Sequence, residues 1–166
     1  MIIYLLRHGE YKQNGDLSKL GKKQIKLIAQ NLKTENIDAI YSSTIKRCVQ
    51  SAEILNKKLR LGIVYDERLK ERGKLTDQPR NEQEKLWWQN YLNSNFSNQN
   101  PEGCKDFFER VFEFVEKLKT KKQSRVLLVA HSALLYALLY YVYKPQSEFA
   151  VWNSLSNGGY VRFEIN

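Results

Sequence analysis

The first predicted strand of the chain is encoded by the stretch IIYLLRHGE at residues 2–10. Its five large apolar residues, at positions 2–6, form a short run of the kind typical of a buried strand. The polar residues Arg7 and His8 follow at once, so the strand ends in charged and titratable groups. A second apolar run, at residues 126–130, leads in the same way into His131. Both histidines of the chain therefore stand at the ends of predicted strands.

Helical and strand patterns alternate along the rest of the chain. Further strands are predicted at residues 39–41 and 62–65, and a final alternating strand at residues 159–165. Apolar residues recur at helical spacing in three segments, at residues 20–32, 45–59 and 107–118. In the first of these, Ile25, Leu27, Ile28 and Leu32 are assigned to one broad apolar stripe. Such alternation indicates an α/β layered domain with a mostly parallel sheet.

Residues 1–166 are predicted to form a single domain, because no linker rich in Pro, Gly or Ser divides them. The pattern weakens only between residues 73 and 101, where a short helix at residues 84–92 would carry Trp87, Trp88 and Tyr91. We interpret residues 73–101 as an insertion that covers the substrate site, since such segments in α/β domains often do so. The same aromatic residues could equally complete the edge of the core.

Composition narrows the classes of function. Lys and Arg number 27 against 18 Asp and Glu, giving a net charge of +9. A positive net charge is compatible with three kinds of partner: anionic small molecules, nucleic acid or an acidic membrane surface. It could equally serve only to keep the protein surface soluble. Cys48 and Cys104 are too few and too far apart for a disulfide scaffold, and with two histidines they match no metal site. The apolar stretch at residues 126–143 is interrupted at His131 and is better explained by a strand and a buried helix than by a membrane span. The start of the chain lacks the pattern of a signal peptide, so we expect a cytoplasmic protein. We also expect that it needs no cofactor.

Charged and nucleophilic residues gather where the predicted strands end. In open α/β sheets, sites form beyond the carboxyl ends of the strands. Arg7 and His8 follow the first strand, Arg47 begins the helix after the second, and His131 starts the helix in which Ser132 offers a free backbone N–H. A neutral imidazole can accept a phosphoryl group, and guanidinium forks match phosphoryl oxygens. A carboxylic acid must still protonate the leaving oxygen.

The order of several short motifs resembles the histidine phosphatase superfamily, also called the phosphoglycerate mutase-like family. The resemblance extends from residue 2 to about residue 135. Five segments carry it: LLRHGE at residues 5–10, LSKLGKKQ at 17–24, SSTIKRCVQSAE at 42–53, DERLKE at 66–71 and VAH at 129–131. The family fold is an α/β/α sandwich with a mostly parallel central sheet, which is consistent with the pattern of elements.

This resemblance implies a role for each candidate site residue. His8 would be the nucleophile, and Arg7, Arg47 and His131 would bind the phosphoryl oxygens. Asn14 stands where the family often places an Asn near the phosphate, and Ser132 stands where Gly is common and could add a hydroxyl. Glu71 would donate the proton, although Glu67 in the same charged loop is an alternative. The implied activity is metal-independent hydrolysis of phosphomonoesters through a phosphohistidine, with a phosphorylated small molecule as substrate.

Three other functions are compatible with parts of the sequence. A phosphoglycerate-type mutase would use the same intermediate, but family mutases of that kind are usually longer. A basic nucleic-acid-binding domain fits the charge, yet the sequence shows no helix-turn-helix, RNA-recognition or zinc-finger pattern. A catalytically inactive relative is disfavoured because the expected site residues are all present. The sequence leaves the identity of the substrate and the oligomeric state open.

Overall fold

The computed structural model describes residues 1–72, 102, 104–143 and 155–165. Within these residues, five strands form one sheet in the order β3-β2-β4-β1-β5. The strands are β1 (Ile2–Arg7), β2 (Ala39–Ser42), β3 (Val64–Tyr65), β4 (Arg125–Ala130) and β5 (Tyr160–Glu164). The pairs β1–β4, β2–β4 and β2–β3 are parallel, and only β5 pairs antiparallel, with β1. The prediction of a mostly parallel sheet is confirmed.

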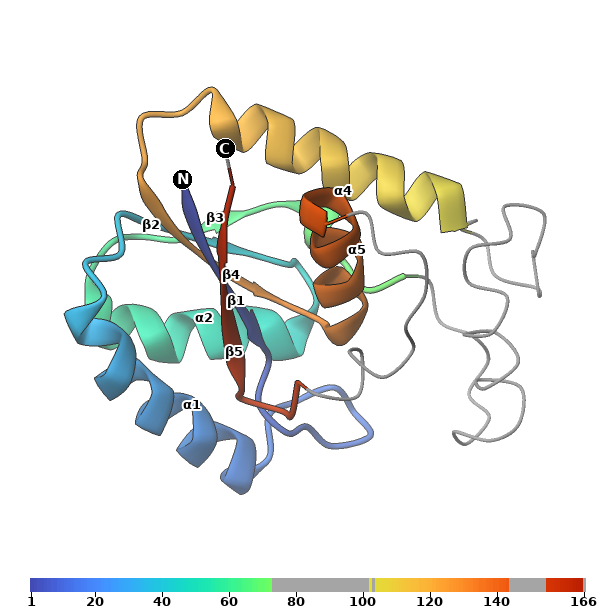
Figure 1. The fold of residues 1–166 in the computed structure, drawn as a ribbon. Coiled ribbons are helices and arrows are strands. Elements are labelled where there is room, and N and C mark those ends of the chain that lie inside the picture. Colours follow the sequence, from blue (N-terminus) through green and yellow to red (C-terminus); the bar gives the residue numbers. More distant parts are fainter. Residues whose placement is uncertain (73–101, 103, 144–154, 166) are drawn as a thin grey trace.

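Helices cover both faces of this sheet (Figure 1). The helices α1 (Lys19–Asn31) and α2 (Lys46–Leu59) pack on one face, and α4 (Cys104–Lys119) and α5 (Ser132–Tyr143) on the other. Each face has its own apolar core because alternate residues of a strand point to opposite sides. In β1, Ile3 and Leu5 join the core under α4 and α5, whereas Tyr4 and Leu6 join the core under α1 and α2. The molecule is therefore the expected three-layer α/β/α sandwich.

Two details of the predicted elements were wrong. Leu27 is 60% exposed rather than part of the apolar stripe of α1. It lies about 200° around the helix from buried Ile25, given about 100° per residue, and so faces solvent. The strand expected at residues 62–65 is reduced to Val64–Tyr65, because Gly62 adopts a φ of +74° that extended backbone does not allow. The predicted helix at residues 84–92 lies outside the described residues.

The loop after β1 rests directly on α1 through two glycines. Helix α1 is capped at its N-terminus by Ser18, whose hydroxyl accepts a hydrogen bond from the Gly21 N–H and donates one to the Glu10 carboxylate. A Cβ atom added at Gly21 would lie 2.0 Å from the Glu10 carbonyl oxygen, and one at Gly9 would lie 2.6 Å from the Gly21 carbonyl oxygen. The absence of these side chains lets the loop that carries His8 approach α1.

We predict that Gly21→Ala destabilises the protein by about 1–3 kcal/mol, because the new methyl group would force the backbones apart. In an ordinary helix the same change would stabilise by up to about 1 kcal/mol. The free energy of unfolding from urea titration measures the effect. Lys23→Ala, on the exposed side of α1, is the matched control and should change stability by less than about 0.5 kcal/mol. A Gly21→Ala protein as stable as the parent would contradict this account of the contact.

Candidate active site

Three parallel strands deliver polar residues to the same edge of the sheet. The backbone N–H of His8, just after β1, donates to the Ala130 carbonyl at 3.0 Å, and that of Ser43, just after β2, donates to the Val129 carbonyl at 3.0 Å. His131 follows β4 directly. The rings of His8 and His131, 123 positions apart in sequence, consequently lie with their centroids 5.2 Å apart.

Arg47 joins the two imidazoles. It is the second residue of α2, which starts just after β2, so its side chain projects from the beginning of the helix over the edge of the sheet. Its Nε donates to Nε2 of His8 at 2.9 Å, and a terminal nitrogen donates to Nδ1 of His131 at 3.1 Å. One planar cation is thus shared between both histidines.

These hydrogen bonds assign the tautomer of each ring, because a guanidinium can only donate. Nε2 of His8 accepts from Arg47, so Nδ1 carries the proton and donates to the Gly9 carbonyl at 2.8 Å. In His131 the roles are reversed, and Nε2 donates to the Ser43 hydroxyl at 3.0 Å. The lone pair of Nε2 in His8 therefore faces Arg47 and accepts its Nε–H.

His131 is fully buried and neutral. Its pKa lies well below the usual value, mainly because burial disfavours the charged ring, and further because Arg47 and His8 lie nearby. The Cys48 sulfur lies 3.3 Å from Nε2 of His131 and donates to the Ala130 carbonyl. Burial raises the pKa of this thiol far above neutrality, so Cys48 packs against the ring as a thiol.

Of the two candidate acids, only Glu71 reaches the histidines. Its Oε2 lies 3.9 Å from Nδ1 of His131. Burial raises the pKa of Glu71 to about 7, although Arg47 and the backbone N–H of Arg72 act in the opposite direction. Glu67 instead is 75% exposed and pairs with Lys70 at 2.7 Å, which lowers its pKa. Geometry and pKa thus favour Glu71 over Glu67 as a proton donor near neutral pH.

Three further residues were predicted to belong to the site, and the structure places them differently relative to the histidines. Arg7 ends β1 and donates to the Leu155 carbonyl at 2.8 Å. The pKa of Glu71 is raised chiefly by burial and lowered most by Arg47, and Arg7 lies near enough to lower it further. Ser132 is buried and begins α5, whose first backbone N–H groups favour anions. Asn14, in contrast, is exposed and bonds to Asp16 at 2.9 Å. The structure does not bring Asn14 to the histidines, so its contact with substrate stays a prediction.

Sequence reasoning missed Tyr11 and assigned no role to Ser43 and Ser51. The Tyr11 ring lies edge-on to His8 at 5.1 Å, and the Arg47 guanidinium carbon lies 4.6 Å above its centre. The Ser51 hydroxyl accepts from the Gly9 N–H at 3.2 Å and donates to the Arg47 carbonyl at 2.7 Å, which ties α2 to the His8 loop. Both serines lie in the motif at residues 42–53, whereas no pattern in the sequence pointed to Tyr11.

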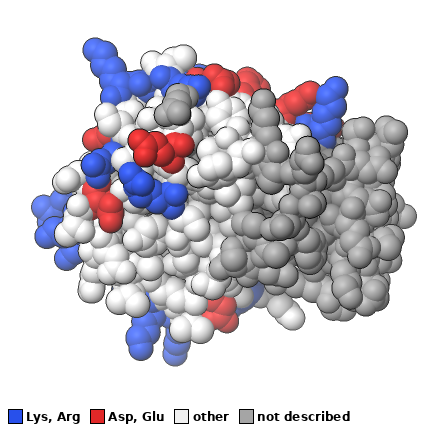
Figure 2. All heavy atoms as spheres, viewed as in Figure 1, with Lys and Arg blue, Asp and Glu red and all other residues white. Residues whose placement is uncertain are grey.

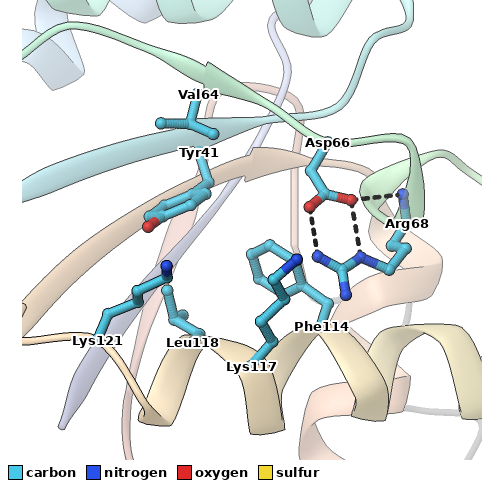
Figure 3. Close-up of a pocket in the computed structure, with 8 residues that line it drawn as sticks. All are labelled: Tyr41, Val64, Asp66, Arg68, Phe114, Lys117, Leu118 and Lys121. Carbon is cyan, nitrogen blue, oxygen red and sulfur yellow. Dashed lines mark hydrogen bonds and ion pairs between the residues drawn. The ribbon is translucent and has the colours of Figure 1, made fainter.

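The pocket drawn in Figure 3 lies elsewhere on the molecule. It has a volume of about 290 Å³ and lies between α4 and the edge of the sheet formed by β2 and β3. None of the candidate catalytic residues lines it. Within the described part of the chain, no group of three or more His, Cys, Asp or Glu side chains is arranged to hold a metal ion.

Comparison with known proteins identifies the family. The family model described as histidine phosphatase superfamily (branch 1) matches residues 3–166. The chain belongs to this superfamily. A Schizosaccharomyces pombe member named "Probable phosphatase C1687.21" is 32% identical over 155 residues, covering 83% of this chain and 71% of its own. The Escherichia coli member named "Probable phosphoglycerate mutase GpmB" is 30% identical over 155 residues, covering 82% and 72%.

Solved structures of two phosphatases share the fold. A mycobacterial glucosyl-3-phosphoglycerate phosphatase in complex with vanadate superimposes with a TM-score of 0.76 at 25% identity, covering 97% of this chain and 91% of its own. The α-ribazole phosphatase of Shigella flexneri gives a TM-score of 0.77 at 21% identity, covering 100% and 91%. The predictions of the family and of the fold class are therefore confirmed.

We predict that Arg47→Lys lowers kcat/KM for a phosphomonoester about 100-fold, because a lysine cannot reach both imidazoles or grip two phosphoryl oxygens. Steady-state release of inorganic phosphate measures the loss. The neighbouring Lys46→Arg is the matched control, since Lys46 is 58% exposed and pairs only with Asp16 among the described residues. It should leave the rate nearly unchanged. Parental activity in Arg47→Lys would place Arg47 outside the site.

Proposed function

We propose that this protein is a metal-independent phosphatase that hydrolyses phosphomonoesters of small molecules through a phosphohistidine on Nε2 of His8. The observation that carries the proposal is the shared Arg47 between the rings of His8 and His131. A tetrahedral anion bound among these three groups would accept the N–H donors of the guanidinium in place of His8, and this would free the lone pair of Nε2 to face the phosphorus. Membership of the superfamily supports the same chemistry.

In the first step, Nε2 of His8 attacks phosphorus and the bond from phosphorus to the leaving oxygen breaks. Glu71 gives its proton to that oxygen, which departs as an alcohol, and leaves Glu71 as a carboxylate. The Gly9 carbonyl, at 2.8 Å from Nδ1, stabilises the positive charge that develops on the His8 ring. Arg47 and Arg7 balance the charge on the equatorial oxygens.

In the second step, water attacks the phosphorus of the phosphohistidine. The Glu71 carboxylate accepts a proton from this water, the bond between phosphorus and nitrogen breaks, and inorganic phosphate leaves. His8 returns to its neutral form and Glu71 to its protonated form, so the cycle closes. One carboxyl with a pKa near 7 can serve both steps because it loses and regains its proton easily at neutral pH.

A phosphoglycerate-type mutase is the second candidate, and the E. coli relative with a mutase name is the observation that favours it. A mutase would form the same phosphohistidine but return the phosphoryl group to bound product instead of water. Incubation with 3-phosphoglycerate separates the two, since a mutase would form 2-phosphoglycerate and a phosphatase would form glycerate and phosphate. The predicted substrate-covering insertion at residues 73–101 lies outside the described residues.

Other partners receive less support. Lys and Arg side chains on the face in Figure 2 lie in several separate groups, some beside acidic side chains. This arrangement does not favour a continuous nucleic-acid-binding surface on that face. Among the described residues, no helix combines the length and apolarity needed to cross a membrane. We propose, as the sequence predicts, that the enzyme acts in the cytoplasm.

We predict that His8→Ala abolishes release of phosphate and that the parent protein, quenched during turnover, carries a phosphoryl group that is stable in base and labile in acid. Phosphoramidates have this stability, whereas phosphoserine and phosphothreonine do not. Intact-protein mass spectrometry after a basic quench detects the adduct. Substantial turnover by His8→Ala would exclude the covalent route.

We predict that activity falls as the pH rises through about 7, because Glu71 must be protonated to serve as the acid and its pKa is about 7. Since the protonated fraction decreases tenfold for each pH unit above the pKa, kcat/KM for an alkyl phosphate should decrease in proportion. Glu71→Gln should lower the rate and remove this basic limb, whereas Glu67→Gln should preserve it. A basic limb that persists in Glu71→Gln would assign the titration to another group.

A further inference from the structure

Glu71 occupies a segment with little regular structure of its own. It follows η2, a short 3₁₀ helix at Glu67–Leu69, whose first turn is capped by Asp66. The Asp66 carboxylate accepts the Arg68 N–H at 2.9 Å and two guanidinium bonds from Arg68 at 3.0 and 2.6 Å (Figure 3). Lys70 then turns to an extended conformation, with φ −60° and ψ 150°. The helix ends before Glu71, so contacts from other elements must position this residue.

Arg110, on α4, supplies such contacts. Its guanidinium donates to the carbonyl of Arg68 and to the carbonyl of Glu71, the latter at 3.4 Å. These two carbonyls lie on either side of Lys70, so one planar group holds the end of η2 and the residue that carries the proposed acid. The Phe107 ring, 4.7 Å below the guanidinium carbon, supports the orientation of this group.

Glu102 completes the arrangement from the segment that precedes α4. Both of its carboxylate oxygens accept from Arg110, one from Nε and the other from a terminal nitrogen at 2.8 Å. Its backbone carbonyl accepts from Nε of Arg72 at 3.1 Å, and the Arg72 N–H donates to Oε1 of Glu71 at 3.2 Å. Arg68 and Glu71 itself are therefore bonded to Arg110, and Arg72, which follows Glu71, is bonded to Glu102.

We propose that Arg110 and Glu102 are positioning residues that hold the Glu71 carboxyl beside the histidines. This inference rests on the proposed function, in which Glu71 is the general acid. Neither residue has a role in the family motifs quoted above. Both side chains are about four-fifths buried, with 19% and 20% exposed, which is consistent with a fixed ion pair and not with a mobile surface pair.

The Arg110–Glu102 pair also affects the charge around Glu71. The pKa of Glu71 is raised chiefly by burial and lowered by several cations, of which Arg110 is one of the weaker. Because Glu102 neutralises Arg110, this cation can hold the backbone without strongly stabilising the Glu71 carboxylate. A free cation at the same place would favour the ionised form of Glu71 and so weaken it as an acid.

A general acid matters most for a leaving group that is a strong base. An alkoxide needs the proton in the transition state, whereas p-nitrophenolate departs readily without it. A defect in the position of Glu71 should therefore slow an alkyl phosphate much more than p-nitrophenyl phosphate. A merely structural defect would slow both substrates alike, so the ratio of the two rates reports on the position of Glu71.

The test measures kcat/KM of the full chain for glycerol 3-phosphate and for p-nitrophenyl phosphate, since kcat/KM reports the step in which the leaving group departs. Arg110→Met should lower the first about 10- to 100-fold, the range expected for a misplaced catalytic group, and the second by less than about threefold. Glu102→Gln should also lower the ratio of kcat/KM for glycerol 3-phosphate to kcat/KM for p-nitrophenyl phosphate. Because Glu102→Gln keeps the backbone carbonyl that binds Arg72, it also remains informative if Arg110→Met fails to fold.

Lys105→Met is the matched control on α4, where it removes the same charge from an exposed pair with Glu109 at 3.6 Å. It should leave the ratio unchanged. Glu71→Gln gives the reference and should lower the ratio further than either positioning variant.

Equal losses on both substrates in Arg110→Met and Glu102→Gln, with a changed ratio in Glu71→Gln, would overturn this inference and leave the proposed function standing. An unchanged ratio in Glu71→Gln would overturn this inference together with the role of Glu71 as general acid, whereas the covalent route through His8 is tested separately by His8→Ala.

Discussion

The site depends on one guanidinium held between two neutral imidazoles. Arg47 can donate to His8 and His131 only because each ring presents an unprotonated nitrogen to it. His8 does so because its other nitrogen is bonded to the Gly9 carbonyl, and His131 does so because burial and nearby cations keep it neutral. This arrangement places an imidazole lone pair and a cation side by side in a chain that belongs to the histidine phosphatase superfamily.

The parallel sheet provides the rigidity that this arrangement needs. The register that pairs Arg7 with Ala130 and Ser42 with Val129 makes three strands end at one level, so His8, Ser43 and His131 emerge together. The helices are then joined to this edge, α2 by the Ser51 hydroxyl and α1 by the contact between Gly9 and Gly21. Because these are backbone and short side-chain contacts, they restrict motion more than long surface side chains could.

Glu71 is positioned differently from the two histidines. It comes from irregular backbone, and its carboxyl lies among several cations but retains a raised pKa because burial outweighs their attraction. The histidines follow the ends of the strands, whereas Glu71, the proposed acid, is bonded to Arg110 on α4 and, through Arg72, to Glu102.

Most of the fold could be predicted from local patterns in the sequence. The apolar runs before His8 and His131 predicted strands, and the boundaries agree with the structure to within a few residues because strand and helix periodicity are local properties. The prediction for Leu27 was wrong because the apolar stripe of α1 is narrower than assumed. The strand at Val64 was predicted too long because the sequence does not reveal the left-handed backbone conformation of Gly62. The family followed from the order of short motifs, and the comparisons confirm it.

The sequence alone determined which residue types follow each strand, and hence that two imidazoles and two guanidiniums belong to one edge of the sheet. The tertiary structure decided which nitrogen each ring offers, that Glu71 and not Glu67 lies near His131, and that Asn14 bonds to Asp16. It also placed Tyr11 against Arg47, and Arg110 against both Glu102 and the Glu71 carbonyl. The physical reason is that strand ends follow from periodicity along the chain. Tautomers, pKa shifts and the position of an acid on irregular backbone depend on neighbours brought together from distant parts of it.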